Sequence, residues 1–354
     1  MRILFTGGGT AGHVNPNLAL IEVLQKKGWD IAYLGGKDSV EERMVKTRGI
    51  AFYPVRSGKL RRYFSWQNFL DPFNLLVGIA QACARIRRLK PQVVFSKGGF
   101  AALPVVIGAW LNRIPVLAHE SDLTPGLANR LSLPFIAVLC VTFSGSKKYL
   151  SGAKKVVVTG TPLRPQLFGG SKEKGLRHCG FTGDKPCILV MGGSQGAEAI
   201  NHCIREALPR LIPDFQVIHL CGKGHVEESA SQPGYFQIEY AEEELGDLMA
   251  AADYVISRAG ANALYEILAC NKPHILIPLP KRASRGDQIH NAQYFEQQGI
   301  SLVIPEEALS IDKLLETLDK LSHHRNEIIS KIQTLEIHSA TESIIQLIEQ
   351  NALA

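Results

Sequence analysis

The chain has 354 residues, of which 45% are hydrophobic and 20% are charged, and its formal net charge is +6. This length allows two domains of ordinary size, and the composition is that of a soluble globular protein with an ample core, not a disordered or fibrous one. The longest apolar run, residues 131–141, is shorter than the ~20 residues that cross a bilayer. The modest positive charge favours anionic partners without indicating nucleic acid.

Cysteine usage and metal motifs restrict the chemistry further. Seven cysteines are dispersed without a C-x-x-C pair. We expect them to be reduced thiols, because the chain begins directly in a predicted strand and shows no secretory leader. No His/Cys cluster has zinc spacing, and no Asp-x-Asp pair is present for a nucleotide-bound metal. The sequence therefore predicts neither a metal nor a cofactor.

The chain begins with a predicted strand, a glycine-rich turn and a helix. Residues 2–5 are mostly apolar, residues 6–13 read Thr-Gly-Gly-Gly-Thr-Ala-Gly-His, and apolar residues recur at helical spacing from Leu18. We expect Pro16 to lie in the first helical turn, where proline is tolerated. Such a turn directs free backbone N–H groups and the positive end of a helix dipole at an anion. Here it also presents the imidazole of His13.

Three interpretations of this turn compete. Gly7-x-Gly9-x-x-Gly12 matches the dinucleotide-binding pattern, but the next predicted strand ends in glycine instead of the acid that binds a ribose. The same glycines nearly fit a phosphate-binding P-loop, but His13 and Val14 replace the residues that hold phosphate and Mg²⁺. We favour an anion-binding turn with a base beside it. The alternative, a plain turn in which His13 only caps the helix, stays open.

Predicted strands alternate with helices through the first half, which indicates a parallel sheet covered on both faces. The strands are predicted at residues 31–34, 93–96, 116–119, 135–141 and 156–159. Residues 167–185 show no periodicity, and we expect them to be a connection between domains.

The pattern then restarts in the second half. Residues 187–191 form a second predicted strand, residues 192–197 a second glycine turn, and further strands are predicted at residues 216–220, 254–257 and 274–277. The last stretch, residues 312–350, is helical, with Ile344, Ile345, Leu347 and Ile348 docking back. Two strand–turn–helix units predict two similar doubly wound domains, whose ligands bind at the carboxyl ends of the strands in a shared cleft.

Polar residues follow three of these strands. Glu266 lies one turn into the helix after residues 254–257, where a carboxylate can accept both ribose hydroxyls; an ordinary first-turn acid is the alternative. Gln288 opens the next helix and can exchange hydrogen bonds with sugar hydroxyls. His119 and Asp122 end a strand of the first half, where function is favoured by topology, although His119 is equally compatible with a satisfied core histidine.

Residues 59–90 combine basic and aromatic side chains. Basic residues at 59–62 and 85–90 bracket an aromatic and aliphatic stretch, residues 63–77. This composition suits a segment that lies in an anionic membrane interface. A loop followed by a buried helix with solvated ends is the alternative.

Six blocks of sequence together resemble one family. They are residues 8–13 with Pro16, 119–122, 160–164, 192–197, 257–261 with Glu266, and 287–292. In this order they are similar to glycosyltransferase family 28, in particular to its bacterial members that add N-acetylglucosamine to the lipid-linked muramyl-pentapeptide of peptidoglycan. The similarity runs from residue 3 to about residue 300, which covers both predicted domains.

The resemblance implies an α/β GT-B architecture, two Rossmann-like doubly wound domains facing a central cleft, and an inverting transfer without a metal. It implies UDP-N-acetylglucosamine as donor, undecaprenyl-linked lipid I as acceptor, and a peripheral location on the cytoplasmic face of the cell inner membrane. Residues 1–163 would form the acceptor and membrane domain, with the helix at 340–354 packing back on it. Residues 164–339 would form the donor domain.

The resemblance also assigns roles to single residues. The substrate-binding residues that it implies are Thr10, Ala11, Gly12, Asp122, Arg164, Ser194, Gln195, Ala261, Asn262, Ala263, Leu264, Tyr265, Glu266 and Gln288. His13 is the expected general base, because an imidazole titrates near neutral pH. Asp122 stands where the family often has asparagine, and it is the second candidate for the base.

Other functions of the same architecture stay open at this point. A glycolipid synthase would use a diacylglycerol acceptor, and a UDP-N-acetylglucosamine epimerase would use no acceptor. A nicotinamide oxidoreductase is least compatible, because the first turn lacks the ribose-binding acid.

Overall fold

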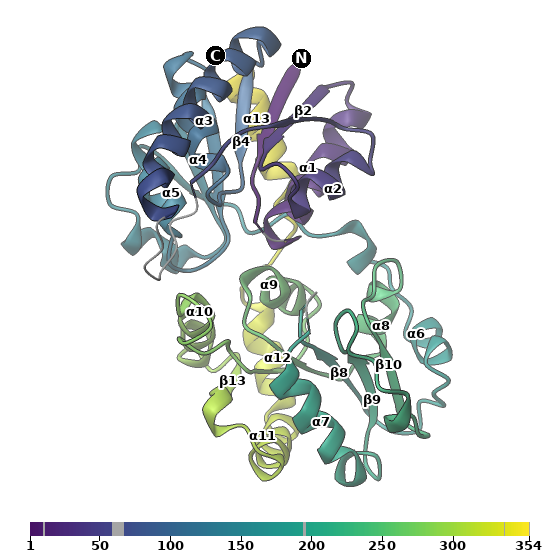
Figure 1. Cartoon of the computed structure of the whole chain (residues 1–354). Helices are drawn as coiled ribbons and strands as arrows, with labels where there is room; N and C mark the ends of the chain where they lie inside the picture. The colour runs from purple at the N-terminus through teal and green to yellow at the C-terminus, as the bar shows by residue number, and fades with distance from the viewer. Residues whose placement is uncertain (10, 59–66, 194–195, 336, 354) are drawn as a thin grey trace. The chain divides into compact units, whose positions relative to one another are not determined.

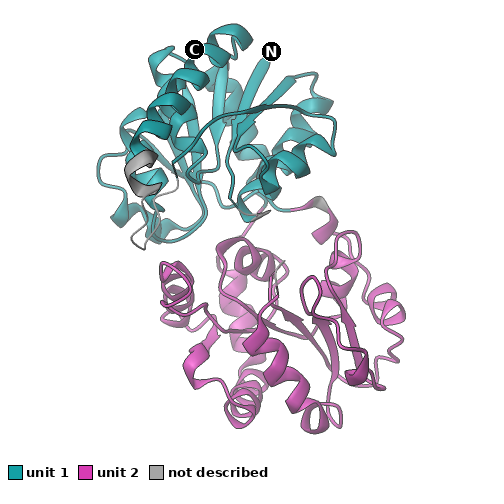
Figure 2. Ribbon diagram, viewed as in Figure 1, with its two compact units in different colours: residues 1–163, 339–354 teal, residues 164–338 magenta. Residues whose placement is uncertain are grey.

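The computed structural model describes residues 1–9, 11–58, 67–193, 196–335 and 337–353, and for residues 11, 67–71 and 165 it describes only the backbone. The described residues form two compact units, residues 1–163 with 339–354 and residues 164–338 (Figure 2). None of the described helices is both long and apolar enough to span a membrane.

Unit 1 is built on a parallel sheet with strand order β3-β2-β1-β4-β5-β6-β7 across its described residues (Figure 1). The strands are β1 Arg2–Thr6, β2 Asp30–Gly35, β3 Ala51–Pro54, β4 Val93–Ser96, β5 Val116–Glu120, β6 Val138–Val141 and β7 Val156–Val158. The helices are α1 Ala11–Lys26, α2 Val40–Lys46, α3 Gln67–Leu89, α4 Ala102–Leu111, α5 Leu127–Ser132 and α13 Thr341–Leu353.

Alternation along the strands of unit 1 creates two cores. Ile3 and Phe5 of β1 lie with apolar residues of α1 and α13 on one face, and Leu4 lies with residues of α3 and α4 on the other. Because successive strand residues point to opposite faces, an almost continuous apolar strand supplies both cores at once. Helix α13 completes the first core through Ile344, Ile345 and Ile348, which are fully buried.

Unit 2 repeats the design with strand order β10-β9-β8-β11-β12-β13. Its strands are β8 Cys187–Met191, β9 Gln216–Leu220, β10 Tyr235–Ile238, β11 Tyr254–Ser257, β12 His274–Leu276 and β13 Leu302–Val303. Its helices are α6 Lys172–His178, α7 Glu198–Leu211, α8 Leu245–Ala251, α9 Ala261–Ala269, α10 Asp287–Glu296, α11 Ile311–His323 and α12 Arg325–Gln333. Both sheets reverse their strand order beside their first strand, as doubly wound sheets do, so the predicted fold class is confirmed.

Three local expectations were wrong. Residues 167–185 contain helix α6, whose N-terminus is capped by the Ser171 hydroxyl accepting from the Lys174 N–H at 3.3 Å. Helix α1 begins at Ala11, so Pro16 is its sixth residue instead of lying in the first turn. The proline costs one helical hydrogen bond there, which packing of the buried face of α1 offsets. The strand predicted at 135–141 begins only at Val138, after a short 3₁₀ turn that contains Pro134.

Candidate active site

The two reversals of strand order define where ligands bind in folds of this kind. In an open parallel sheet, a crevice forms outside the carboxyl ends of the two strands that flank the reversal. These strands are β1 and β4 in unit 1 and β8 and β11 in unit 2. The segments that follow them are residues 7–13, 97–99, 192–197 and 258–261, and most of the predicted site residues lie in or beside these segments.

The first glycine turn of unit 1 is satisfied from within the unit. The Gly8 N–H donates to the Gly98 carbonyl at 3.2 Å, and the Gly9 N–H donates to a carboxylate oxygen of Glu41 at 3.1 Å. The second oxygen of Glu41 accepts from the Gly36 N–H at 3.2 Å, and this side chain is only 2% exposed. The expectation of free N–H groups is therefore wrong at Gly8 and Gly9, because an internal carboxylate and a carbonyl occupy them.

The turns after β1 and β4 are pressed together. Gly99 adopts a positive φ of 87°, and a Cβ there would lie 2.3 Å from the Gly8 carbonyl oxygen. Only glycine permits this approach. Among the site residues predicted here, Gly12 is exposed and His13 is half-buried in the first turn of α1. Thr10 and the side chain of Ala11 lie outside the described residues.

A buried lysine that the sequence analysis missed lies behind these turns. Lys97 follows β4 directly and is 2% exposed. Its ammonium contacts Nδ1 of His119 at 2.6 Å and donates to the Ser121 hydroxyl. The available signal was a lysine followed by two glycines immediately after a buried strand, since the carboxyl end of β4 flanks the reversal of strand order.

His119 is a satisfied core histidine. It is fully buried, and its Nε2 lies 2.7 Å from the Gly160 carbonyl oxygen. A carbonyl can only accept, so Nε2 carries the proton and Nδ1 accepts from Lys97. Burial, and then the adjacent Lys97 charge, lower the pKa of His119 well below its ordinary value. A neutral, enclosed imidazole with both nitrogens occupied is a poor general base.

Glu120 builds the segment that carries Asp122. One oxygen of Glu120 accepts from the Asp122 N–H at 3.1 Å, and the other accepts from the Gly126 N–H at 3.0 Å and from the Asn129 side chain at 2.8 Å. Glu120 is 5% exposed, whereas Asp122 is half-buried. The carboxylate of Glu120 is thus committed to the backbone, and Asp122 is the acid of this segment that retains solvent access.

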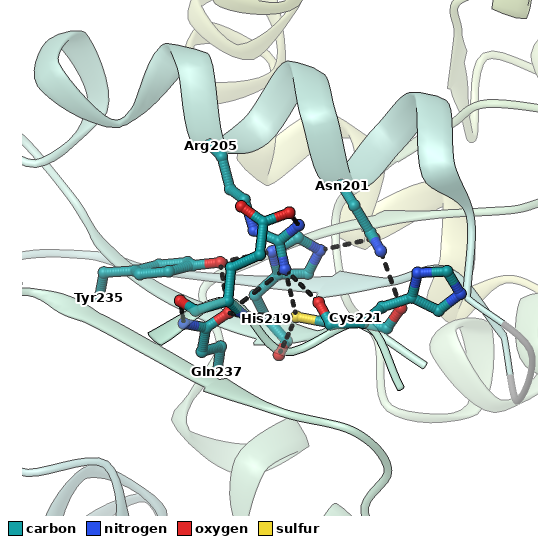
Figure 3. A network of polar contacts seen from close by, with 8 residues as sticks. Asn201, Arg205, His219, Cys221, Tyr235 and Gln237 are labelled. Carbon is teal, nitrogen blue, oxygen red and sulfur yellow. Dashed lines mark hydrogen bonds and ion pairs between the residues drawn. The ribbon is translucent and has the colours of Figure 1, made fainter. Parts of the chain in front are cut away.

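In unit 2 the second glycine turn is backed by a polar network (Figure 3). A Cβ on Gly196 would lie 2.4 Å from the Cys221 carbonyl, so the segment after β9 presses directly on the turn. That carbonyl accepts from the Asn201 amide at 2.9 Å. The network continues through Arg205, His219, Tyr235 and Gln237. Ser194 and Gln195, predicted for this turn, lie outside the described residues.

Arg164 and Glu266 form a two-pronged ion pair within unit 2. The Arg164 Nε and a terminal guanidinium nitrogen donate to the two carboxylate oxygens of Glu266, both at 3.0 Å. The Glu266 side chain is 13% exposed and that of Arg164 is 25% exposed. Each carboxylate oxygen can accept a second hydrogen bond, so the pair orients Glu266 and leaves it capable of accepting from a diol.

The start of α9 presents backbone rather than side chains. The side chains of Ala261, Leu264 and Tyr265 are buried, and the Tyr265 hydroxyl donates to the His338 carbonyl at 3.0 Å. Asn262 and Ala263 are half-buried. A ligand at this helix start would therefore meet amide groups and the positive end of the helix dipole.

Gln288 faces the same helix start. Its side-chain oxygen accepts from the Leu279 N–H at 3.0 Å, which fixes the orientation of the amide. Its nitrogen lies 3.9 Å from the position that a Cβ on Gly260 would occupy. Gln288 thus offers its NH₂ group beside the N-terminus of α9. The sequence predicted that Gln288 both donates and accepts, but its oxygen is already bonded to the Leu279 N–H, so its main role toward a ligand is that of a donor.

Arg258 has a structural role. Its guanidinium pairs with Glu306 at 2.5 Å and donates to the Ile277 carbonyl at 3.2 Å. Across the described part of the chain, no group of three or more His, Cys, Asp or Glu side chains is arranged to hold a metal ion.

These features define the chain as a two-unit α/β protein of the GT-B class. We call Arg164, Glu266, Gln288 and the start of α9 in unit 2 the candidate donor seat. Residues 3–139 match the glycosyltransferase family 28 N-terminal domain, and residues 187–348 match the glycosyltransferase family 28 C-terminal domain. The chain belongs to glycosyltransferase family 28.

Relatives of known description match the chain from end to end. A UDP-N-acetylglucosamine--N-acetylmuramyl-(pentapeptide) pyrophosphoryl-undecaprenol N-acetylglucosamine transferase of Legionella pneumophila (strain Lens) is 57% identical, with 99% of this chain and 97% of that protein covered. The protein of the same description from Clostridium tetani (strain Massachusetts / E88) is 49% identical, with 99% and 98% covered. The crystal structure of Acinetobacter baumannii MurG is 25% identical and matches with a TM-score of 0.79 over 99% of both chains.

Proposed function

We propose that the chain transfers N-acetylglucosamine from UDP-N-acetylglucosamine to the muramyl sugar of undecaprenyl-linked lipid I, a step of peptidoglycan synthesis. The observation that carries this proposal is the identity of 57% to a transferase of that description over the full length of both proteins. The candidate donor seat supports it, because its groups have the chemistry that a nucleotide sugar requires.

The donor binds to unit 2 in this proposal. The carboxylate of Glu266, oriented by Arg164, accepts from the ribose hydroxyls, and the amides at the start of α9 face the diphosphate. Gln288 donates its amide hydrogens to the sugar. The predicted contacts of Ser194 and Gln195 belong to the same seat. Backbone amides and a helix dipole stabilise charge that develops on the departing diphosphate, so this chemistry needs no metal.

The acceptor binds to unit 1. The 4-hydroxyl of its muramyl sugar attacks the anomeric carbon, the new C–O bond forms as the bond to UDP breaks, and UDP leaves with the electron pair. His13 takes the proton of the attacking hydroxyl as general base. A single displacement converts the α-linked donor into a β-linked product. Asp122 accepts a hydrogen bond from the acceptor, and Gly12 and its neighbours in the first turn border the reacting groups.

Membrane contact occurs through unit 1, because the lipid tail of the acceptor stays in the bilayer. Helix α4 contacts both α3 and α5 (Figure 1), and the three carry exposed large apolar side chains: Phe73, Leu76, Trp110, Leu111, Leu127 and Leu131. Exposed basic residues lie on the same helices, including Arg85, Arg88 and Arg130. We assign this face, within and beyond residues 59–90, to an anionic membrane surface on the cytoplasmic side.

An acceptor-swap assay tests the proposal. The full chain is incubated with labelled UDP-N-acetylglucosamine and a short-chain lipid I analogue, with diacylglycerol, or with no acceptor. Label is expected in the lipid I product only. Label in a glycolipid would favour the diacylglycerol synthase, and conversion of the donor with no acceptor would favour the epimerase. Either of these results would refute the proposal.

A further inference from the structure

Lys97 connects two strand ends of unit 1. It follows β4, and its two polar partners, His119 and Ser121, lie at and just beyond the end of β5. These strands are hydrogen-bonded neighbours in the sheet. Asp122, the acid assigned to the acceptor, directly follows Ser121. The buried ammonium of Lys97 therefore fixes the position of the segment after β5 that contains Asp122.

The carbonyl of Gly160 determines which group donates in the hydrogen bond between Lys97 and His119. That carbonyl accepts from Nε2 of His119, so Nδ1 has no proton and must accept from the Lys97 ammonium. Ser121 accepts through its oxygen. A neutral Lys97 amine would still have two N–H groups for these two partners, so loss of its proton removes the positive charge that strengthens both hydrogen bonds.

Several charged and titratable groups face Lys97 from the elements around it. They are Glu120 at the end of β5, Asp122 just after it, Cys140 of β6, and the neutral ring of His119. Burial lowers the pKa of Lys97 to about 8, and the two carboxylates oppose this shift. An enclosed ammonium is tolerated only where such partners compensate the loss of hydration.

We propose that Lys97 is a positioning residue for the acceptor, one that holds the Asp122 segment through charge-assisted hydrogen bonds to His119 and Ser121. This rests on the proposed function. Lys97 acts through Ser121 and Asp122 and does not touch the substrate.

The direct test replaces Lys97 by methionine, which keeps an unbranched side chain one atom shorter and removes the charge. For Lys97→Met we expect kcat/KM for the lipid I analogue to fall roughly 10- to 100-fold, since small misplacements at a site have effects of this size. The dissociation constant of UDP-N-acetylglucosamine should stay within about two-fold, because the donor seat is in unit 2.

Lys272→Met is the matched control. Lys272 is a half-buried lysine of unit 2 that donates to the Ala252 carbonyl at 2.7 Å. Both variants lose an enclosed ammonium, but only Lys97→Met should change the acceptor kinetics. Equal acceptor kinetics in Lys97→Met and the wild type would overturn the proposal.

A pH profile separates positioning from simple structural support. In the wild type, kcat/KM for the acceptor should decline above about pH 8 as Lys97 loses its proton. Lys97→Met should lack this decline and remain low throughout. A merely structural lysine would reduce stability in the variant without removing a titration from the profile. A decline near pH 8 that persists in Lys97→Met would contradict the proposal.

Ser121→Ala is the second test, for the case that Lys97→Met does not fold. Ser121 is half-buried, and its hydroxyl accepts the hydrogen bond from Lys97 that the proposal requires. We expect a several-fold higher KM for the acceptor and unchanged donor binding. A wild-type profile that is flat through pH 8, together with normal kinetics of Ser121→Ala, would overturn the role of Lys97. Absence of any transfer by the wild type would instead refute the proposed function.

Discussion

His13 lies third in α1 and is half-buried. Three other histidines are fully buried: His119, His219 and His274. The pKa of each is lowered, and the main cause is that burial disfavours the charged form. Each has both ring nitrogens within hydrogen-bond distance of a partner. A general base must take a proton and pass it on near neutral pH, and enclosed, satisfied imidazoles are unsuited to this.

His13→Ala should therefore lower kcat by a factor of roughly 10² to 10⁴, the range that general base catalysis contributes. The KM for UDP-N-acetylglucosamine should change little, because the proposed donor seat lies in unit 2. Initial rates with the lipid I analogue measure both quantities. His323→Ala, which removes a largely exposed histidine of α11, is the control. An unchanged kcat in His13→Ala would remove His13 from the reaction.

Substitution of Glu266, the partner of Arg164, should mainly change the KM for the donor, the opposite of the pattern expected for His13. Glu266→Gln should raise the KM for the donor about 10-fold with a smaller effect on kcat, since a hydrogen bond to a charged group contributes about 1.5–3 kcal/mol. Donor titrations of the initial rate measure this change. A normal KM would refute the assignment of Glu266 to the ribose.

Loss of an enclosed ion pair also lowers stability. A second variant measures how much of the effect of Glu266→Gln comes from this loss alone. Glu306→Gln breaks the ion pair between Glu306 and Arg258. The side chains of these two residues are each 11% exposed. A decrease of Tm that both variants share belongs to the loss of an ion pair. A rise of donor KM that is specific to Glu266→Gln belongs to the donor seat.

At the scale of the elements, α3 carries the most exposed apolar residues of the proposed membrane face. Phe73 is 63% exposed and Leu76 is 65% exposed. The double variant Phe73→Ser with Leu76→Ser should bind vesicles of phosphatidylglycerol more weakly, because less apolar surface enters the interface. Sedimentation with vesicles measures the binding, and activity on a short-chain soluble acceptor should be kept.

Phe168→Ser is the matched control for this experiment, since Phe168 is 51% exposed but belongs to unit 2. Vesicle binding that does not differ between the double variant and the control would show that α3 does not contact the membrane. The basic and aromatic residues at 59–66, and the side chains of residues 67–71, lie outside the described residues, and their part in this face stays a prediction.

The sequence predicted all interior strands and one edge strand, β7, and the strands that it missed all lie at sheet edges. β3, β10 and β13 each form an edge of a sheet. Interior parallel strands are buried on both faces and read as continuous apolar runs, whereas β3 is exposed or half-buried along its length and β13 has only two residues. Edge strands have weak local patterns because the neighbouring strand, instead of their own composition, fixes them.

The site shows the same limit. The glycine turns, His13, Glu266 and Gln288 follow strands with a clear pattern, so the sequence indicated them. Lys97 and Glu41 each bind a glycine turn or strand end through a partner that is 22 or 32 residues away in the chain. A lysine or glutamate with a distant partner reads as an ordinary surface charge until the sheet brings the pair together.

At the scale of the whole molecule, the buried histidines make stability depend on pH. The pKa of His219 is lowered to about 3 and that of His274 to about 4, and the pKa of His119 is lowered well below 6.5. Between about pH 4 and pH 6.5 the unfolded chain binds protons that the folded chain does not. Stability should therefore rise with pH in this window, by about 1.4 kcal/mol per pH unit for each histidine, and become constant above it.

Urea unfolding at pH 5 and pH 7.5 measures this dependence. The tryptophans, Trp29, Trp66 and Trp110, all belong to unit 1, so fluorescence follows that unit and circular dichroism follows both. Unit 1 contains one of the three histidines and unit 2 the other two, so the acid shift should be larger in circular dichroism than in fluorescence. Midpoints that do not change between the two pH values would contradict the assignment of these rings as neutral in the folded state.

The configuration of the sugar linkage in the product is the most direct test of the account. The full chain is supplied with UDP-N-acetylglucosamine and a short-chain lipid I analogue, and proton NMR of the purified product reports the new anomeric linkage. We expect a β-linked N-acetylglucosamine on the 4-hydroxyl of the muramyl sugar, with one UDP released for each sugar transferred. An α-linked product, or release of UDP without a disaccharide, would contradict it.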